Sequence, residues 1–155
     1  MKGHDVVIAI MGGFPAPDQQ VITNFSEPAR QFFPAMRACG IKRYFTVFGA
    51  GFLGAEDQIP KDWQDDGNPE MVAINKIRRD MRIQWDLIVE HELDFTIWCP
   101  ANYPAGPRSS EYEIGHNSFV GVEVTTGMVA DSIVKEISDR KMTRVRVGIT
   151  RKDKQ

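Results

Sequence analysis

The chain has 155 residues, of which 42% are hydrophobic and 26% charged, and its formal net charge is −2 at pH 7. This length and composition fit one globular domain with a moderate core and exclude two domains of ordinary size. The nearly balanced charge gives no electrostatic reason to expect nucleic acid as a partner. No apolar run approaches the roughly 18 residues that cross a bilayer. We therefore expect a cytoplasmic protein without a membrane partner.

The first half of the chain predicts two strands and two helices. Residues 6–11 are continuously apolar and end at Gly12 and Gly13, which is typical of a buried parallel strand. A helix is expected over 27–39, with Ser26 as its cap and Gly40 just past its end, and a second strand over 42–48. A longer helix begins at Asn68 and Pro69. Its expected core face carries Ile74, Ile77, Met81, Trp85 and Ile88.

The second half continues the alternation of strands and helices. A third strand is expected over 94–99, a Pro- and Gly-rich loop over 100–110, and short extended pieces at 112–114 and 120–124. Thr125 or Thr126 caps a third helix, and residues 143–149 form a last strand. The third helix is expected to bury Val129, Ile133, Val134 and Ile137. The order predicts an α/β fold: a partial Rossmann-type, mostly parallel sheet of about four main strands with helices on both faces. We expect one domain over 1–150 and a tail over 151–155.

A complete G-x-G-x-x-G follows the second predicted strand, at Gly49-Ala50-Gly51-Phe52-Leu53-Gly54. In a dinucleotide-binding fingerprint these glycines turn a strand into a helix, whose N-terminus holds the pyrophosphate. The residues after Gly54 include Pro60 and Pro69 and have no apolar repeat at helical spacing. The motif has its strand but lacks its helix. The nearest candidate for the acid that binds the ribose, Glu70, instead opens a helix.

Other candidate site residues are few. His4, His91 and His116 are scattered, so we expect no metal site. His91 is better suited to complement the negative end of the long helix than to work in catalysis. Asn102 and Tyr103 follow the third strand, and Gly12 and Gly13 follow the first, where α/β sheets bind ligands; ordinary turns at these points are the alternative. Cys39 and Cys99 are expected to be packing thiols rather than a disulfide.

Several segments resemble the atypical short-chain dehydrogenase/reductases, namely 26–43, 93–100, 106–112 and 4–8. The resemblance is nearest to the NAD(P)H-dependent flavin reductase, or biliverdin reductase B, group and its NmrA-like neighbours. It covers nearly the whole chain but only the C-terminal half of the family's domain. It therefore implies that the first three strand–helix units, with the family's own glycine motif, would precede Met1.

This resemblance implies NADP or NAD as cofactor and a flavin-like or tetrapyrrole small molecule as substrate. The cofactor would lie against Gly12, Gly13, Gly49, Ala50, Gly51 and Pro100. Asn102, Tyr103 and Trp85 would contact the substrate, with Trp85 and Asn102 at positions where biliverdin-type members have histidines. Phe48 or Gly49 replaces the family's hydroxyl, and the chain has no Tyr-x-x-x-Lys. No matching proton donor is present.

Two functions remain open. The first is an NAD(P)H-dependent oxidoreductase-like protein with weak or no independent catalysis. The second is a non-enzymatic binding or regulatory protein. Exposing about half of the apolar surface of strand 5–11 would cost on the order of 3–6 kcal/mol, and its backbone would invite edge pairing. We therefore expect this strand to be covered by a second copy, by a full-length relative or by another partner chain.

Overall fold

A computed structural model describes residues 1, 3–13, 19–65 and 67–152. The chain forms two compact units. The first comprises Met1–Arg43 with Pro60–Leu93, and the second comprises Tyr44–Ile59 with the residues from Asp94 onward. The elements alternate as the sequence predicts for an α/β fold.

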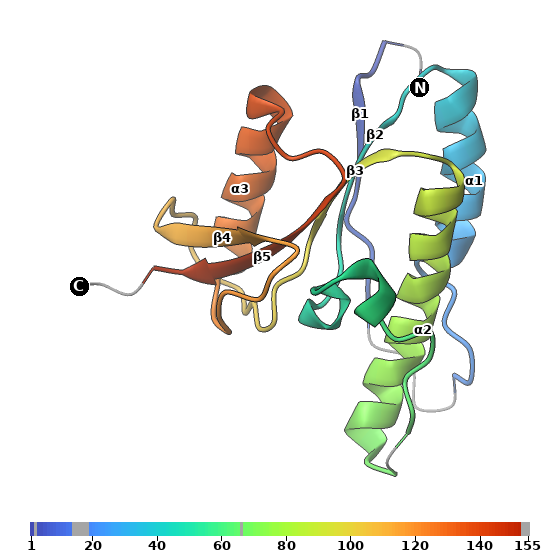
Figure 1. Cartoon of the computed structure of the whole chain (residues 1–155), viewed down its shortest axis with the longest axis vertical. Helices are drawn as coiled ribbons and strands as arrows, with labels where there is room; N and C mark the ends of the chain where they lie inside the picture. The colour runs from blue at the N-terminus through green and yellow to red at the C-terminus, as the bar shows by residue number, and fades with distance from the viewer. Residues whose placement is uncertain (2, 14–18, 66, 153–155) are drawn as a thin grey trace. The chain divides into compact units, whose positions relative to one another are not determined.

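The first unit contains strand β1 (Val6–Ala9) and helices α1 (Ser26–Ala38) and α2 (Pro69–Glu90). The two helices pack side by side (Figure 1). The start of α2 confirms the sequence prediction: the Asn68 side chain accepts a hydrogen bond from the Glu70 N–H at 3.0 Å, and Pro69 occupies the first turn. Local sequence is sufficient here because the cap and the capped N–H lie two residues apart.

The predicted Ser26 cap of α1 is wrong. Ser26 is the first helical residue, and no side chain of the local sequence caps this end. Instead the carboxylate of Asp80 on α2 accepts hydrogen bonds from the backbone N–H groups of Phe25, at 2.8 Å, and Ser26, at 3.3 Å. A buried carboxylate at a helix N-terminus satisfies free N–H groups and lies at the positive end of the helix dipole. The cap therefore comes from 54 residues away along the chain.

The core face of α2 is only partly the apolar stripe that its spacing predicts. Trp85 and Ile88 are buried, whereas Ile74, Ile77 and Met81 are only half-buried. Polar side chains take the buried positions of the N-terminal half, where Asp80 caps α1 and Asn75 donates to Gln64 O and Asp65 Oδ1. These long-range partners offset the cost of burying polar groups, so the simple apolar pattern does not hold.

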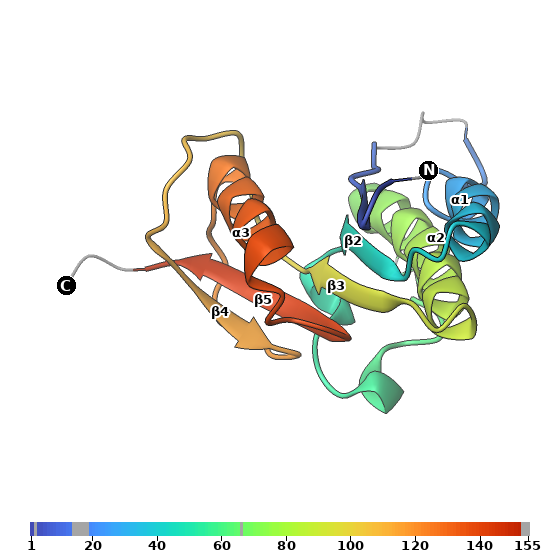
Figure 2. The same ribbon diagram turned by 90° about the horizontal axis from the view of Figure 1, so that it is seen from above.

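The second unit is a sheet covered by one helix. Strands β2 (Arg43–Val47), β3 (Asp94–Trp98), β5 (Val145–Arg151) and β4 (Tyr112–His116) follow one another in that order. β3 and β5 are parallel, whereas β4 runs antiparallel to β5. Helix α3 (Thr126–Asp139) lies along one face of β4 and β5 (Figure 2). Its predicted cap is confirmed, because Thr125 Oγ1 accepts from Met128 N–H at 3.2 Å.

The core of the second unit is aromatic. Phe45 packs edge-on against Trp98 at 5.2 Å between ring centroids, and Phe48 packs against Phe52 at 4.7 Å. The indole N–H of Trp98 donates to Ser132 Oγ on α3 at 2.9 Å, which ties the helix to the sheet. On α3 the predicted core residues Val129 and Ile133 are buried, but Val134 and Ile137 face outward, 54% and 36% exposed.

Two extended segments differ from the sequence prediction. Residues 120–124 form no strand; they contribute a single bridge between Asn102 and Glu123. The last strand runs two residues beyond Ile149, where Arg151 pairs with Tyr112 in register and forms an ion pair with Glu123 at 3.0 Å. Of the predicted tail, residues 153–155 lie outside the described part. The one-domain expectation stays a prediction.

Both cysteines are free thiols, with Cys39 exposed and Cys99 buried. Burial raises the pKa of the Cys99 thiol above its ordinary value. Among the helices in the described ranges, none is both long enough and apolar enough to cross a bilayer.

Candidate functional site

The glycine motif forms a compact loop and no α-helix. Two short 3-10 turns follow β2, at Ala50–Phe52 and Glu56–Gln58, and over the described residues 49–65 no α-helix begins. Three backbone N–H groups of the motif already have acceptors. Phe52 donates to Gly49 O at 3.1 Å, Leu53 to Ala50 O at 3.0 Å, and Gly54 to Asn117 O at 2.9 Å.

The loop is held from beneath by a buried arginine of β5. The guanidinium of Arg146 donates to Phe52 O at 2.6 Å and to Gly54 O at 2.8 Å, and the residue is only 4% exposed. Asn117 binds the backbone of Arg146 on both sides, accepting from its N–H at 3.0 Å and donating to its carbonyl at 2.6 Å. Burial lowers the pKa of Arg146. The guanidinium of Arg146 therefore holds the glycine loop in place through the carbonyls of Phe52 and Gly54.

This geometry does not fit a pyrophosphate cradle. A pyrophosphate site of the fingerprint type needs free N–H groups at the N-terminus of a helix. No α-helix begins in residues 49–54, and three of their backbone N–H groups already donate to carbonyl oxygens of the protein. The motif therefore works as a structured strand-to-loop turn.

The structure brings several predicted site residues together at one edge of the second unit. Phe48 N–H donates to Trp98 O at 2.8 Å, so the next residues, Gly49 after β2 and Pro100 after β3, leave neighbouring strands at the same end. Ala50 is half-buried and Gly51 is exposed. This edge is the carboxyl end of the parallel strands, where open α/β sheets bind ligands.

Asn102 and Tyr103 follow at the same edge. The backbone of Asn102 pairs with Val122 and Val124, donating at 3.0 Å and accepting at 3.2 Å. Its side chain is exposed, and Tyr103 is 44% exposed. Both side chains are therefore accessible to a ligand.

Of the remaining candidate residues, Gly12, Gly13, Trp85 and His91 lie in the first unit and His116 lies in the second. Gly12 has open space where a side chain would begin, and Gly13 adopts φ +131°, a conformation that favours glycine. Trp85 lies on α2 and is 3% exposed. His91 ends α2 and packs edge-on against Phe33 at 5.6 Å between ring centroids. His116 lies in β4 opposite Val147.

Sequence reasoning missed a polar cluster around Asp131 of α3. Its carboxylate accepts from Arg108 Nε at 2.7 Å, from Lys135 Nζ at 2.7 Å and from the Tyr112 hydroxyl at 3.1 Å, and its side chain is 4% exposed. Lys135 and Arg108 lower the pKa of Asp131 to about 2. Burial, followed by the hydrogen bond to Asp131, raises the pKa of Tyr112. Only the i, i+4 spacing of Asp131 and Lys135 could have been found from sequence.

Metal-ligating side chains do not gather within the ranges that the structure describes: no three His, Cys, Asp or Glu residues lie together there. The carboxyl edge carries glycine backbone, the amide of Asn102 and the phenol of Tyr103.

Comparisons with known proteins agree with this α/β architecture. The chain is 23% identical to a proposed NADH-flavin reductase from Streptococcus pneumoniae, with a TM-score of 0.72 over 97% of this chain and 73% of that one. It is 24% identical to a Rossmann-fold NAD(P)-binding family protein from Shigella flexneri (TM-score 0.61; 99% and 66% covered). An oxidoreductase from Lactococcus lactis is 19% identical (TM-score 0.68; 97% and 63% covered).

These structures share the fold, and the chain spans 63 to 73% of their lengths. Among curated proteins, none matches the chain significantly. The sequence profile described as NAD(P)H-binding matches residues 1–140, which is most of the chain. The chain therefore belongs to the NAD(P)H-binding family.

Proposed function

We propose that the chain takes part in the NAD(P)H-dependent reduction of a flavin or a similar planar acceptor, with weak or no catalysis of its own. Membership of the NAD(P)H-binding family over residues 1–140 supports the cofactor class. The likeness to the Streptococcus pneumoniae protein supports the acceptor class. When bound, the nicotinamide supplies the hydride, and the protein binds and orients the two partners.

The carboxyl edge of the second unit is the proposed place of this chemistry. Gly49, Ala50, Gly51 and Pro100 offer backbone that a flat ring can approach closely. Asn102 and Tyr103 have exposed side chains at the same edge and would contact the acceptor. In the first unit, a cofactor contact at Gly12 and Gly13 and a substrate contact at Trp85, which is 3% exposed, stay predictions.

The geometry of the glycine loop is the observation that supports weak activity. Because no α-helix follows residues 49–54, and the N–H groups of Phe52, Leu53 and Gly54 already have acceptors, the motif does not form a pyrophosphate site of the fingerprint type. The nearest phenol to α3, Tyr112, already donates to Asp131, and its raised pKa makes it a poor proton donor at neutral pH. The main contribution of this chain is then to orient the nicotinamide and the acceptor.

A titration with NADPH and NADH tests the proposal through the intrinsic fluorescence of Trp63, Trp85 and Trp98. Saturable quenching in the micromolar range would support it, and turnover with a flavin acceptor should be slow. Silence up to millimolar cofactor would contradict it.

Two glycine variants sharpen this test. A Cβ at Gly49 would meet no atom within 4 Å, so Gly49→Ala should leave stability within about 0.5 kcal/mol of the parent while weakening NADPH binding several-fold. Gly54 has φ +107°, and a Cβ added there would lie 3.3 Å from Gln58 Oε1, so Gly54→Ala should cost about 1–2 kcal/mol of stability. Thermal unfolding and fluorescence titration measure the two effects. Unchanged NADPH affinity in Gly49→Ala would remove Gly49 from the proposed site.

The alternative function is a binding or regulatory protein that associates with itself or with a full-length relative. Ile8 of β1 is 41% exposed and Ile10 just after it is 59% exposed, which is unusual for a strand this apolar. Covering these side chains in a second copy would recover part of their burial energy, about 1.5–3 kcal/mol for each fully buried residue.

Sedimentation at micromolar concentration tests this alternative. We expect a dimer in the parent chain and a monomer in Ile10→Lys, because a charge at this position is costly to bury. Val134→Lys is the matched control: Val134 is similarly exposed, at 54%, but lies on α3, so it should leave the dimer intact. A parent chain that sediments as a folded monomer would refute the alternative.

A further inference from the structure

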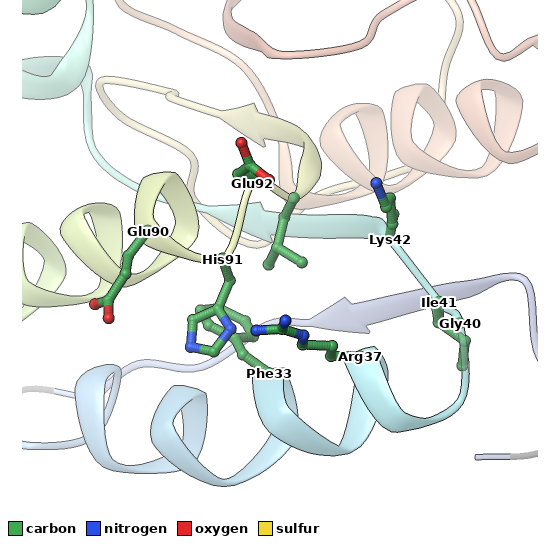
Figure 3. A pocket seen from close by; sticks show the side chains of 9 residues that line it. Phe33, Arg37, Gly40, Ile41, Lys42, Glu90, His91 and Glu92 are labelled. Carbon is green, nitrogen blue, oxygen red and sulfur yellow. The ribbon is translucent and has the colours of Figure 1, made fainter.

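A cavity of about 250 Å³ opens at the C-terminal ends of α1 and α2, entirely within the first unit (Figure 3). Phe33 and Arg37 of α1 line it, with Ile41 just after that helix. His91 and Leu93 after α2 complete the wall. Phe33, Ile41 and Leu93 are buried, so the inner wall is apolar. Of the candidate residues considered from sequence, His91 lines this cavity, whereas the proposed cofactor and substrate contacts do not.

The cavity owes its shape to two helix ends of the same kind. At the end of α1, Gly40 adopts φ +71° and Ile41 N–H donates to Met36 O at 2.9 Å. At the end of α2, Glu92 adopts φ +50° and Leu93 N–H donates to Ile88 O at 3.2 Å. These are paired Schellman caps, in which the loop N–H groups satisfy the last helical carbonyls. These bonds satisfy the carbonyls of Met36 and Arg37 on α1 and of Ile88 and Val89 on α2.

Arg37 is distinct among the arginines of these two helices. Arg30, Arg78, Arg79 and Arg82 each have an acceptor within the chain. Within the described ranges, the side chain of Arg37 forms no hydrogen bond or ion pair. Figure 3 shows its guanidinium extending toward the His91 ring, which packs on Phe33. The five N–H donors of the guanidinium are therefore available at the mouth of a cavity whose inner wall is apolar.

The side chain that favours an anion at the gap is Arg37. Lys42 also belongs to the lining, but in Figure 3 its amino group points away from the gap between Arg37 and His91. The two acidic residues of the lining, Glu90 and Glu92, are exposed, and in Figure 3 their carboxylates point away from the gap between Arg37 and His91. The ring of His91 can donate a further hydrogen bond from either nitrogen that carries a proton.

We propose that this cavity binds a small organic carboxylate with a single-ring or similarly compact apolar body. The Arg37 guanidinium holds the carboxylate, since its planar fork matches two carboxylate oxygens. The body of the ligand packs against Phe33, Ile41 and Leu93. The volume is below the roughly 300–1,000 Å³ of sites for drug-sized ligands, but a cavity of about 150 Å³ already accepts benzene. The site does not depend on the proposed reductase function.

Amide chemical shifts of the full chain, titrated with benzoate, test the proposal. We expect saturable shifts of the Gly40 and His91 amides, which lie in the lining. Arg37→Gln should weaken benzoate binding by at least about tenfold, because it removes a charge-assisted pair of hydrogen bonds. Arg30→Gln is the matched control: Arg30 lies on the same helix, half-exposed, and pairs with Glu27 instead, so affinity should change less than twofold.

Neutral benzamide and inorganic phosphate separate the two parts of the proposal. Benzamide has the ring without the charge, and phosphate has the charge without the ring, so each should bind at least tenfold more weakly than benzoate. Equal binding of benzamide, or unchanged benzoate affinity in Arg37→Gln, would overturn the role of Arg37. Equal binding of phosphate would overturn the apolar subsite. Absence of saturable shifts with benzoate would overturn the proposal as a whole.

Discussion

Arg146→Met is expected to lower the free energy of unfolding by about 2–4 kcal/mol, because it leaves the buried carbonyls of Phe52 and Gly54 without their donor. Methionine keeps much of the side-chain volume, so the loss reports mainly the two hydrogen bonds. Urea unfolding monitored by circular dichroism measures the change. Hydrogen exchange of the Gly54 amide, which donates to Asn117 O, should accelerate as the glycine loop loosens.

Arg151→Met is the control on the same strand. Arg151 is 53% exposed and pairs with Glu123 at 3.0 Å on the surface, where an ion pair contributes at most about 1 kcal/mol. A loss in Arg146→Met no larger than in Arg151→Met would show that the guanidinium does not hold the glycine loop.

Asp80→Ala is expected to cost about 2–3 kcal/mol, because it removes the acceptor of two backbone N–H groups at the start of α1 and leaves them buried. Asp80 is 1% exposed, so water cannot readily replace the carboxylate. Equilibrium unfolding measures the loss, and the amides of Phe25 and Ser26 should lose their protection from hydrogen exchange.

Asp80→Asn keeps one side-chain acceptor and should recover a substantial part of the lost stability. Asp86→Ala is the control on the same helix, since its carboxylate is 58% exposed and pairs with Arg82 at i, i+4 spacing, for which about 0.3–0.5 kcal/mol is typical. Equal stability losses in Asp80→Ala and Asp86→Ala would refute the long-range cap.

Local features of the fold were predicted well from sequence. Asn68 and Thr125 cap their helices as expected, because each cap accepts from an N–H only two or three residues away. Gly40 ends α1 with a positive φ for the same local reason. The apolar runs located the four strands β1, β2, β3 and β5 to within about two residues.

Features with distant partners were not predicted. Ser26 is a good local cap, but the carboxylate of Asp80 satisfies this helix start instead. The side chain of Asn75 is buried on α2 because Gln64 and Asp65 accept its hydrogen bonds. Arg146 lies between Val145 and Val147 in a predicted strand, which indicates that its charge is buried and needs hydrogen-bond partners. Those partners lie more than 90 residues away along the chain, so the sequence does not identify them.

For the candidate site, the sequence by itself determined the α/β class, the absence of a helix after Gly54 and the positions of Gly49, Pro100, Asn102 and Tyr103 at strand ends. These follow from periodicity and from residues such as proline, which act over a few positions. Only the tertiary structure decided that Arg146 and Asn117 fix the glycine loop, that Asp131 gathers Arg108, Tyr112 and Lys135, and that Arg37 faces a cavity. Each of these depends on hydrogen-bond donors and acceptors that packing brings together from distant parts of the sequence, and no local pattern specifies which distant partner satisfies a buried polar group.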